Sequence, residues 1–272
     1  MLGDACNFSV KEKYENGKWV ENEFSEPTLF ISTELEIEEC QTMALAFISG
    51  VNESHILDGE YYAGEEERVI KAAHILAEAP LYIEFLPDFS IRDVESSIKK
   101  HIRKFGCKYV AHDYIQSTPK ILAEISKQVG KVKLREDNIL FMLSAKLKDL
   151  ANQYGIFILT GTQLNGNWKE NKEPGAECLS GAKSIINRMD AGEILMPLND
   201  VDREMIAPLV EKLGCPMPNM YRSVYKNRRG ELKGVRIWCV SDLGTCRTKT
   251  LFITDHQYNY IEVKETKIGK RS

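Results

Sequence analysis

Three polar side chains in this sequence lie at the ends of short, mostly apolar runs: Glu34, Asp113 and Gln163. In an α/β protein, ligands bind beyond the carboxyl ends of parallel strands, where an aspartate can meet a metal ion or its water shell. Hydrolysis of a nucleotide triphosphate requires a carboxylate that activates water, a second carboxylate for Mg²⁺ and a polar side chain that senses the γ-phosphate. The three residues have the types and the placement that this chemistry needs.

A basic segment late in the chain supplies a fourth requirement, a cation that neutralises charge in the transition state. Lys226 and Arg228 are the candidates. Each residue also has an ordinary explanation: Glu34 could be a favourable charge at a helix N-terminus, Gln163 a hydrogen-bonding group at a strand end, and Arg228 a solubilising charge. All four kinds occur in the expected order along the chain, which favours the catalytic interpretation.

The elements that would position these residues alternate between strands and helices. Apolar runs and helical spacing predict strands at 28–32, 81–85, 109–113, 156–160 and 193–196, and helices at 37–50, 65–79, 90–105, 136–154, 181–190 and 202–213. The order strand, two helices, strand, helix, strand over residues 28–113 favours a parallel sheet with right-handed crossovers. From residue 220 onward the period becomes two, which predicts strands near 220–225, 235–240, 249–253 and 258–263. The expected fold class is α/β, with a mainly parallel central sheet and a C-terminal antiparallel extension.

The composition limits the possible functions. Thirty-six basic and forty acidic residues give a net charge of −4, so nucleic acid would be bound only through local patches. No apolar run is long enough to span a bilayer, and the N-terminus does not resemble a signal peptide. The seven cysteines and five histidines are scattered, which suggests neither a disulfide framework nor a zinc site. A reduced, cytoplasmic environment is expected.

At these residues the sequence resembles the C-terminal, RecA-like ATPase domain of the DnaB-type replicative DNA helicases. The similarity covers roughly residues 28 to 263 and is carried by short motifs in the family's order, namely Phe30–Leu35, Asp113–Gln116, Ser144–Ala151, Thr162–Asn165, Ser180–Ala182 and Lys226–Arg228. The resemblance implies a three-layer RecA-like fold, with residues 1–272 forming a single motor domain. Residues 1–26 are expected to be the remainder of a helix followed by an exposed, hairpin-like excursion.

The resemblance also implies a role for each candidate residue. Glu34 corresponds to the catalytic base that polarises the attacking water, and Asp113 to the Walker B carboxylate that holds Mg²⁺. Gln163 corresponds to the sensor between nucleotide and DNA. Lys226 and Arg228 correspond to a pair that reaches the phosphates of the neighbouring subunit, which implies a homo-oligomer, a hexameric ring. ATP and Mg²⁺ are the implied cofactors.

Two loops are implied to hold single-stranded DNA by its backbone. Their basic residues are Lys120, Lys127, Lys131, Lys133 and Arg135 after Asp113, and Lys169, Lys172 and Lys183 after Gln163. Binding of this kind depends on salt and is largely indifferent to base sequence. A primase and a helicase loader are further implied partners, in the cytoplasm of a bacterium or a phage-infected cell; no membrane partner is expected.

The sequence departs from the family pattern in its phosphate site, because no G-x-x-x-x-G-K-[ST] motif occurs in it. We expect that the chain starts shortly after the Walker A loop, so that its N-terminus is incomplete. Two hypotheses follow: a truncated or split ATP-dependent DNA helicase domain that is inactive as this fragment, or a non-catalytic RecA-fold module that binds DNA or assembles with a complete helicase. The DNA upstream of the Met1 codon would distinguish them, since an in-frame phosphate loop there means a fragment.

Overall fold

The computed structural model describes residues 1–129, 136–163, 185–186, 188–228, 230 and 232–263. Within the chain, two compact units are distinguished, each of which is described by itself. The first comprises Met1–Gly166, Leu179–Met189 and Asp242–Arg247, and the second Asn167–Cys178, Asp190–Ser241 and Thr248–Ser272. The expectation of one motor domain over residues 1–272 remains a prediction.

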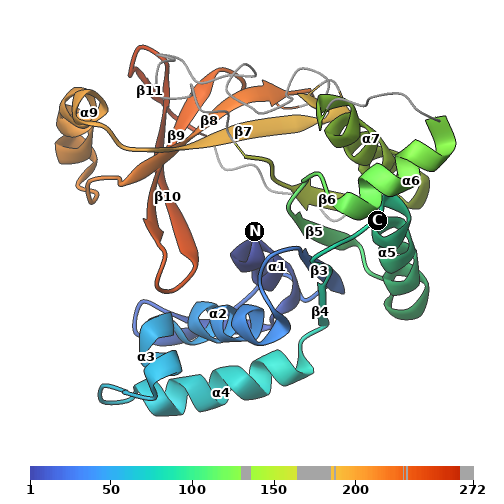
Figure 1. The fold of residues 1–272 in the computed structure, drawn as a ribbon. Helices are drawn as coiled ribbons and strands as arrows, with labels where there is room; N and C mark the ends of the chain where they lie inside the picture. The colour runs from blue at the N-terminus through green and yellow to red at the C-terminus, as the bar shows by residue number, and fades with distance from the viewer. Residues whose placement is uncertain (130–135, 164–184, 187, 229, 231, 264–272) are drawn as a thin grey trace, which may run out of the picture. The chain divides into compact units, whose positions relative to one another are not determined.

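The first unit is built on a sheet of four parallel strands in the order β4-β3-β5-β6 (Figure 1). The strands are β3 (Thr28–Ser32), β4 (Leu81–Phe85), β5 (Tyr109–Asp113) and β6 (Phe157–Thr160). All five residues of β3 are buried, as expected for a central strand of a parallel sheet that is covered on both faces. The parallel sheet predicted from the order of elements is confirmed.

Helices cover both faces of this sheet because successive strand residues point to opposite sides. Phe30 and Ala111 pack with α1 (Leu2–Ser9), α2 (Ile37–Ser49) and α4 (Glu65–Glu78). Leu29, Ile31 and Val110 pack with α5 (Ile91–Phe105), α6 (Pro119–Val129) and α7 (Glu136–Tyr154). The result is the three-layer α/β arrangement that the sequence predicts.

Local signals fix the ends of several of these helices. Ser90 and Asp93 form a reciprocal capping box at the start of α5, which satisfies backbone N–H groups that have no partner in the first turn. Gly106 ends α5 with a φ of +69°, and Gly50 ends α2 with a φ of +64°, a backbone conformation that glycine adopts without steric cost. These boundaries agree with the prediction. The sequence did not reveal α6 or the short α3 (Glu53–Asp58).

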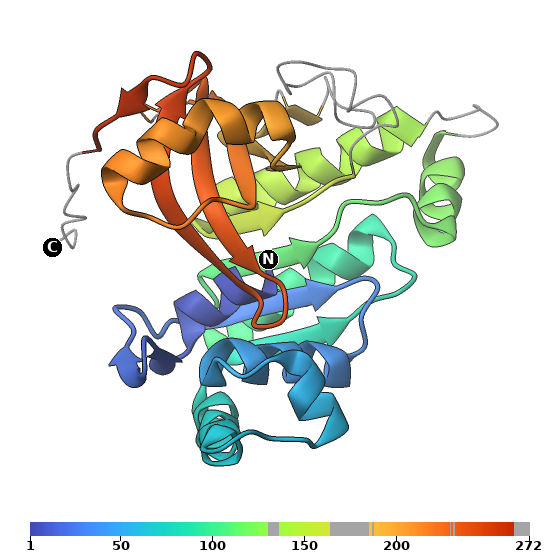
Figure 2. The same ribbon diagram turned by 90° about the vertical axis from the view of Figure 1, so that its left-hand side faces the viewer.

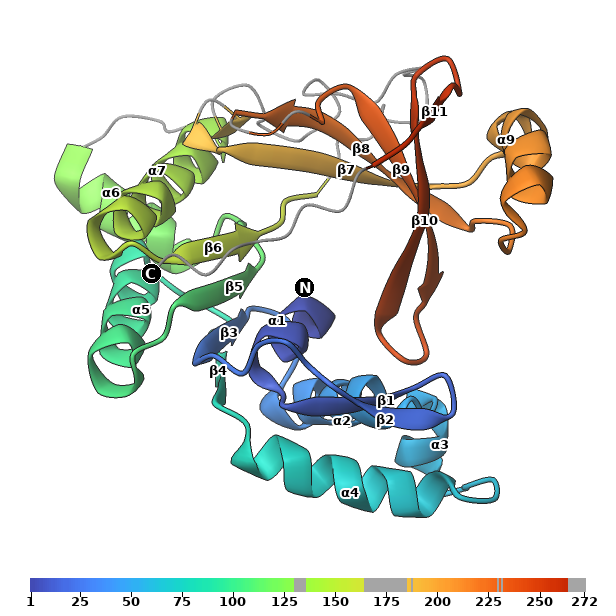
Figure 3. The ribbon, with the colours of Figure 1, turned by 180° about the vertical axis from the view of Figure 1, so that it is seen from behind.

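The hairpin-like excursion expected near the N-terminus is a hairpin of β1 (Glu12–Glu15) and β2 (Lys18–Glu21), seen beside α2 in Figure 3. Its two-residue turn, Asn16-Gly17, has positive φ at both positions, as a twisted hairpin turn requires. The hairpin is less exposed than predicted: the Lys71 ammonium lies 4.1 Å from the centre of the Trp19 ring.

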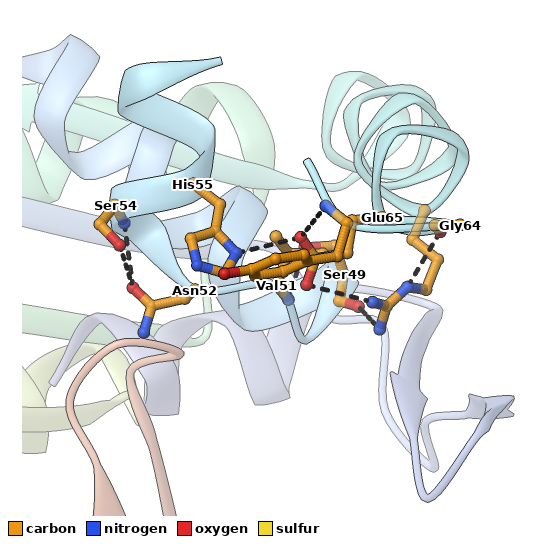
Figure 4. Close-up of polar contacts among 9 residues, drawn as sticks. Ser49, Val51, Asn52, Ser54, His55, Gly64 and Glu65 are labelled. Atoms are coloured by element: carbon orange, nitrogen blue, oxygen red, sulfur yellow. Dashed lines mark hydrogen bonds and ion pairs between the residues drawn. The ribbon is translucent and has the colours of Figure 1, made fainter. Parts of the chain in front are cut away.

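A cluster of polar side chains connects α2, α3 and α4 (Figure 4). The Asn52 side chain accepts a hydrogen bond of 3.0 Å from the Ser54 N–H and so caps α3. His55 Nδ1 lies 3.0 Å from Glu65 Oε2, while the Arg68 guanidinium lies 3.7 Å from Glu65 Oε1. Glu65 thus holds the turn between α3 and α4.

The second unit contains a sheet in the order β11-β10-β9-β8-β7. Its elements are β7 (Ala191–Pro197), α9 (Asp200–Leu213), β8 (Met220–Asn227), β9 (Val235–Asp242), β10 (Arg247–Asp255) and β11 (Tyr260–Ile261). The pairs β7–β8, β8–β9 and β10–β11 are antiparallel, which confirms the predicted C-terminal antiparallel extension.

None of the helices in the described part of the chain has the length and apolar character needed to cross a bilayer.

Helix α9 lies against this sheet (Figure 2), and a buried ion pair attaches it there. Arg236 Nη1 donates to Asp202 Oδ1 at 3.0 Å, and the two side chains are only 5% and 4% exposed. The Tyr258 hydroxyl donates to the same oxygen at 2.7 Å, and the Asn199 amide donates to the other oxygen at 2.7 Å. The Arg236 guanidinium also lies 4.9 Å from the centre of the Tyr258 ring.

Removal of the Asp202 carboxylate should destabilise the second unit strongly. Asp202→Ala leaves the Arg236 guanidinium buried without its counter-charge, so we expect the free energy of unfolding to fall by about 3–5 kcal/mol. Urea unfolding followed by tryptophan fluorescence measures this loss, since Trp238 stacks on Tyr258 at 6.2 Å.

Glu193→Ala is the matched control, because Glu193 pairs with Arg222 at 3.3 Å in a partly exposed ion pair. We expect this control to cost less than about 1 kcal/mol. An equal fall in the free energy of unfolding for the two variants would contradict the claim that the buried ion pair costs more to break than the exposed one.

Candidate active site

The carboxyl ends of three neighbouring strands bring Glu34, Asp113 and Gln163 to one edge of the parallel sheet. Ser32 at the end of β3 pairs with Asp113 at the end of β5, and β6 is the next strand along. Glu34 and Gln163 come two and three residues beyond β3 and β6, respectively. The structure therefore places the three sequence-predicted residues together.

A continuous chain of hydrogen bonds joins two of these residues through Tyr114. The Tyr114 hydroxyl donates to Glu34 Oε1 at 3.0 Å, and it accepts a bond of 2.9 Å from Gln163 Nε2. Each of the three side chains comes from the end of a different strand. No role was predicted for Tyr114, although it directly follows Asp113 in the motif Asp113–Gln116.

Thr33 fixes the backbone next to these hydrogen-bonded side chains. Its N–H and its hydroxyl both donate to the Asp113 carbonyl oxygen, at 2.9 Å and 2.8 Å. The Thr33 hydroxyl in turn accepts from the Tyr114 N–H at 3.2 Å. On the other side, the Ile115 N–H donates to the Gly161 carbonyl oxygen at 2.9 Å. Tyr114 is thus held between the ends of β3 and β6.

The Asp113 carboxylate has the character of a ligand for a hard cation. Burial raises the pKa of Asp113, and the negative charge of Glu34 raises it further, so a nearby cation would stabilise the ionised form. Within the described part of the chain, no hydrogen-bond donor contacts this carboxylate. Mg²⁺ is usually held by one or two carboxylates together with phosphates and water, and Asp113 fits this pattern.

His112, to which the sequence assigned no role, is fully buried in β5. Its Nδ1 lies 3.2 Å from the Thr160 hydroxyl oxygen, and that hydroxyl donates to the His112 carbonyl oxygen at 2.9 Å. The hydroxyl therefore accepts from Nδ1–H, which assigns the tautomer. Burial lowers the pKa of His112 to about 4, so the ring is neutral at pH 7. It ties β5 to β6 next to Asp113.

Lys226 and Arg228 belong to the second unit, at the end of β8. The register of β7 against β8 shifts between Gly192 and Glu193, leaving Tyr225 as the extra residue of a bulge; bulges commonly redirect the side chains that follow. Arg228 Nη1 lies 3.4 Å from Asp190 Oδ1. Partial burial lowers the pKa of Lys226, and the positive charge of Arg228 lowers it further.

Only two of the predicted DNA-contacting residues fall in the described part of the chain. Lys120 lies in α6, where its ammonium donates to the Asp88 carbonyl oxygen at 2.9 Å, and Lys127 is exposed in the last turn of the same helix. The others lie outside the described residues, namely Lys131, Lys133, Arg135, Lys169, Lys172 and Lys183.

The buried His112 should make the first unit less stable in acid. Its pKa falls from 6.5 in the unfolded chain to about 4 in the folded protein, so the unfolded state binds a proton first. The stabilisation is complete above pH 6.5 and is lost as the pH falls toward 4, by up to about 3 kcal/mol. His112→Asn, whose amide can still donate to Thr160, should lack this part of the pH dependence.

Urea unfolding of both proteins at pH 7, 6 and 5 measures the difference. Two parallel curves of unfolding free energy against pH would show that His112 is not the titrating group.

Comparison with known proteins identifies the family. The family model described as the DnaB-like helicase C terminal domain matches residues 11–245. Over 274 residues the chain is 40% identical to the SPbeta prophage-derived uncharacterized protein YorI of Bacillus subtilis strain 168. This match covers 98% of the chain and 54% of YorI, so the chain spans about half the length of this curated relative.

Solved structures show the same fold. One of them, described as an ATPase domain, superposes with a TM-score of 0.65 at 16% identity, covering 83% of this chain and 75% of that one. A DnaB-like replicative helicase, described with its interactions with primase, gives 0.61 at 16% identity, covering 80% of this chain and 49% of that one. The fold is therefore RecA-like, and the chain belongs to the DnaB-like helicase C-terminal domain family.

Proposed function

We propose that this chain is the motor part of an ATP-dependent replicative DNA helicase. In this function, ATP hydrolysis at subunit interfaces is coupled to translocation on single-stranded DNA and to duplex unwinding. The observation that carries the proposal is the meeting of Glu34, Asp113 and Gln163 at the ends of three adjacent parallel strands. Membership of the DnaB-like family supports it.

The proposed role of each residue follows from its chemistry. Bound Mg²⁺ would neutralise phosphate charge, and Asp113 would hold it. Glu34 is exposed at the strand edge, where its carboxylate would orient and deprotonate the attacking water. Gln163 would sense the γ-phosphate. Lys226 and Arg228 would stabilise the transition state of a neighbouring subunit, which makes a ring, expected to be a hexamer, necessary for activity.

A second candidate function is favoured by the absence of G-x-x-x-x-G-K-[ST] from the 272 residues. That loop supplies the backbone N–H groups and the lysine that surround the β- and γ-phosphates. Without such groups, Glu34 and Asp113 would have no fixed phosphate to act on. The chain would then be a non-catalytic RecA-fold module that binds DNA or assembles with a complete helicase.

The proposed partners are single-stranded DNA, further copies of the chain, a primase and a helicase loader. Lysines such as Lys120 and Lys127 would contact DNA phosphates, so that affinity falls as salt rises. One structural neighbour is described with its interactions with primase, which motivates the primase proposal. The proposed location is the cytoplasm of a bacterium or a phage-infected cell.

The 272-residue chain by itself should not hydrolyse ATP, because its sequence contains no G-x-x-x-x-G-K-[ST] motif to bind the β- and γ-phosphates. Steady-state phosphate release should equal that of Glu34→Gln, with and without single-stranded DNA. Release above that control would mean that other groups position the phosphates, and the non-catalytic alternative would then fail.

In a longer form of the protein that hydrolyses ATP, Arg228 should act across the subunit boundary. Mixing Arg228→Ala subunits with Glu34→Gln subunits should restore part of the activity, because one kind of interface then contains both intact groups. Phosphate release of the mixture, compared with each variant alone, measures this. Mixtures that never exceed either variant would assign Arg228 to its own subunit and remove the argument for a ring.

A further inference from the structure

The Tyr114 hydroxyl occupies a position from which it contacts two functional side chains at once. It donates to Glu34 Oε1 at 3.0 Å and accepts from Gln163 Nε2 at 2.9 Å. A hydroxyl group has one hydrogen to donate and lone pairs that accept. Its single hydrogen is therefore directed at Glu34, and one lone pair is occupied by the Gln163 amide.

Tyr114 is held through the backbone at the ends of two strands, β3 and β6. Its backbone is fixed from β3 by Thr33, through a bond of 3.2 Å to the Tyr114 N–H. It is fixed from β6 through the bond of 2.9 Å between the Ile115 N–H and the Gly161 carbonyl oxygen. Glu34 and Gln163, in contrast, are exposed side chains on the residues beyond the strands, with several rotatable bonds each.

The two hydrogen bonds depend on each other. Donation from the Gln163 amide polarises the Tyr114 O–H group, which strengthens its own donation to the Glu34 carboxylate. If Gln163 turned toward another acceptor, such as a phosphate oxygen, this reinforcement would disappear. The Glu34 carboxylate would then be held less tightly and could rotate.

We propose that Tyr114 is a positioning residue that holds the Glu34 carboxylate and links its position to the hydrogen bonding of Gln163. The inference rests on the proposed function, in which Glu34 orients water and Gln163 senses phosphate. It adds a physical connection between the two side chains. When a ligand accepts the hydrogen bond of the Gln163 amide in place of Tyr114, the hydrogen bond between Tyr114 and Glu34 weakens and the Glu34 carboxylate can move. The Tyr114 hydroxyl is the group through which the two side chains are connected.

The test follows the NMR signal of the Gln163 side-chain amide at constant pH, in the full chain. The signal is assigned with Gln163→Leu. Glu34→Gln should shift it in the native background, because the altered partner changes the polarisation of the Tyr114 hydroxyl. In a Tyr114→Phe background, which lacks only the hydroxyl, Glu34→Gln should shift it no longer.

Glu38→Gln is the control, since it removes another exposed carboxylate, from the first turn of α2. We expect no shift of the Gln163 amide with this variant. An equal effect of Glu34→Gln with and without the hydroxyl would overturn the proposal, because the field of the charge alone would then explain it. Absence of any shift in the native background would overturn it as well.

A second arm adds Mg²⁺·ADP, Mg²⁺ with a non-hydrolysable ATP analogue, or an oligodeoxythymidylate to the same samples. Binding is measured separately by fluorescence anisotropy of a labelled ligand. A ligand that binds and acts on Gln163 should shift the Tyr114 ¹³Cζ signal in the native chain, and this shift should be lost in Gln163→Leu. Binding without such a shift would overturn the link to ligands. Failure of every ligand to bind would count against the proposed function, while the first arm still decides on the link.

Discussion

The carbonyl oxygen of Asp113 is the point on which the candidate active site depends. It accepts two hydrogen bonds from Thr33, one from the N–H at 2.9 Å and one from the hydroxyl at 2.8 Å. Thr33 is 3% exposed, and buried polar groups of this kind must be paired within the protein. This pairing fixes the end of β3 against the end of β5, so that Glu34 and Asp113 follow neighbouring strand ends at one edge of the sheet.

The same edge concentrates negative charge. Burial raises the pKa of Asp113, and the negative charge of Glu34 raises it further. Structures tolerate such an arrangement at functional sites, where a cation or a ligand relieves it. The two carboxylates that carry this charge are exposed at Glu34 and half-buried at Asp113. The strands beneath them are held by apolar layers on both faces of the sheet.

The two units are stabilised by different means. In the first, alternate residues of β3 and β5 pack against helices on opposite faces, and apolar burial is the main contribution. In the second, α9 is joined to the sheet by the buried ion pair of Arg236 and Asp202, which Tyr258 and Asn199 complete with hydrogen bonds. A buried ion pair of this kind adds little by itself but makes the loss of one partner costly.

The sequence by itself determined most of the elements, though not α3 or α6, and it identified Glu34, Asp113 and Gln163 as candidate catalytic residues. Runs such as 28–32, the capping box at Ser90 and the glycine at 106 are local signals, because they act within one turn or one strand. Only the tertiary structure decided which residues meet. Tyr114 contacts Glu34 across 80 positions of chain and Gln163 across 49. No periodicity or spacing encodes such a contact, since it depends on the register and order of the strands rather than on neighbours in sequence.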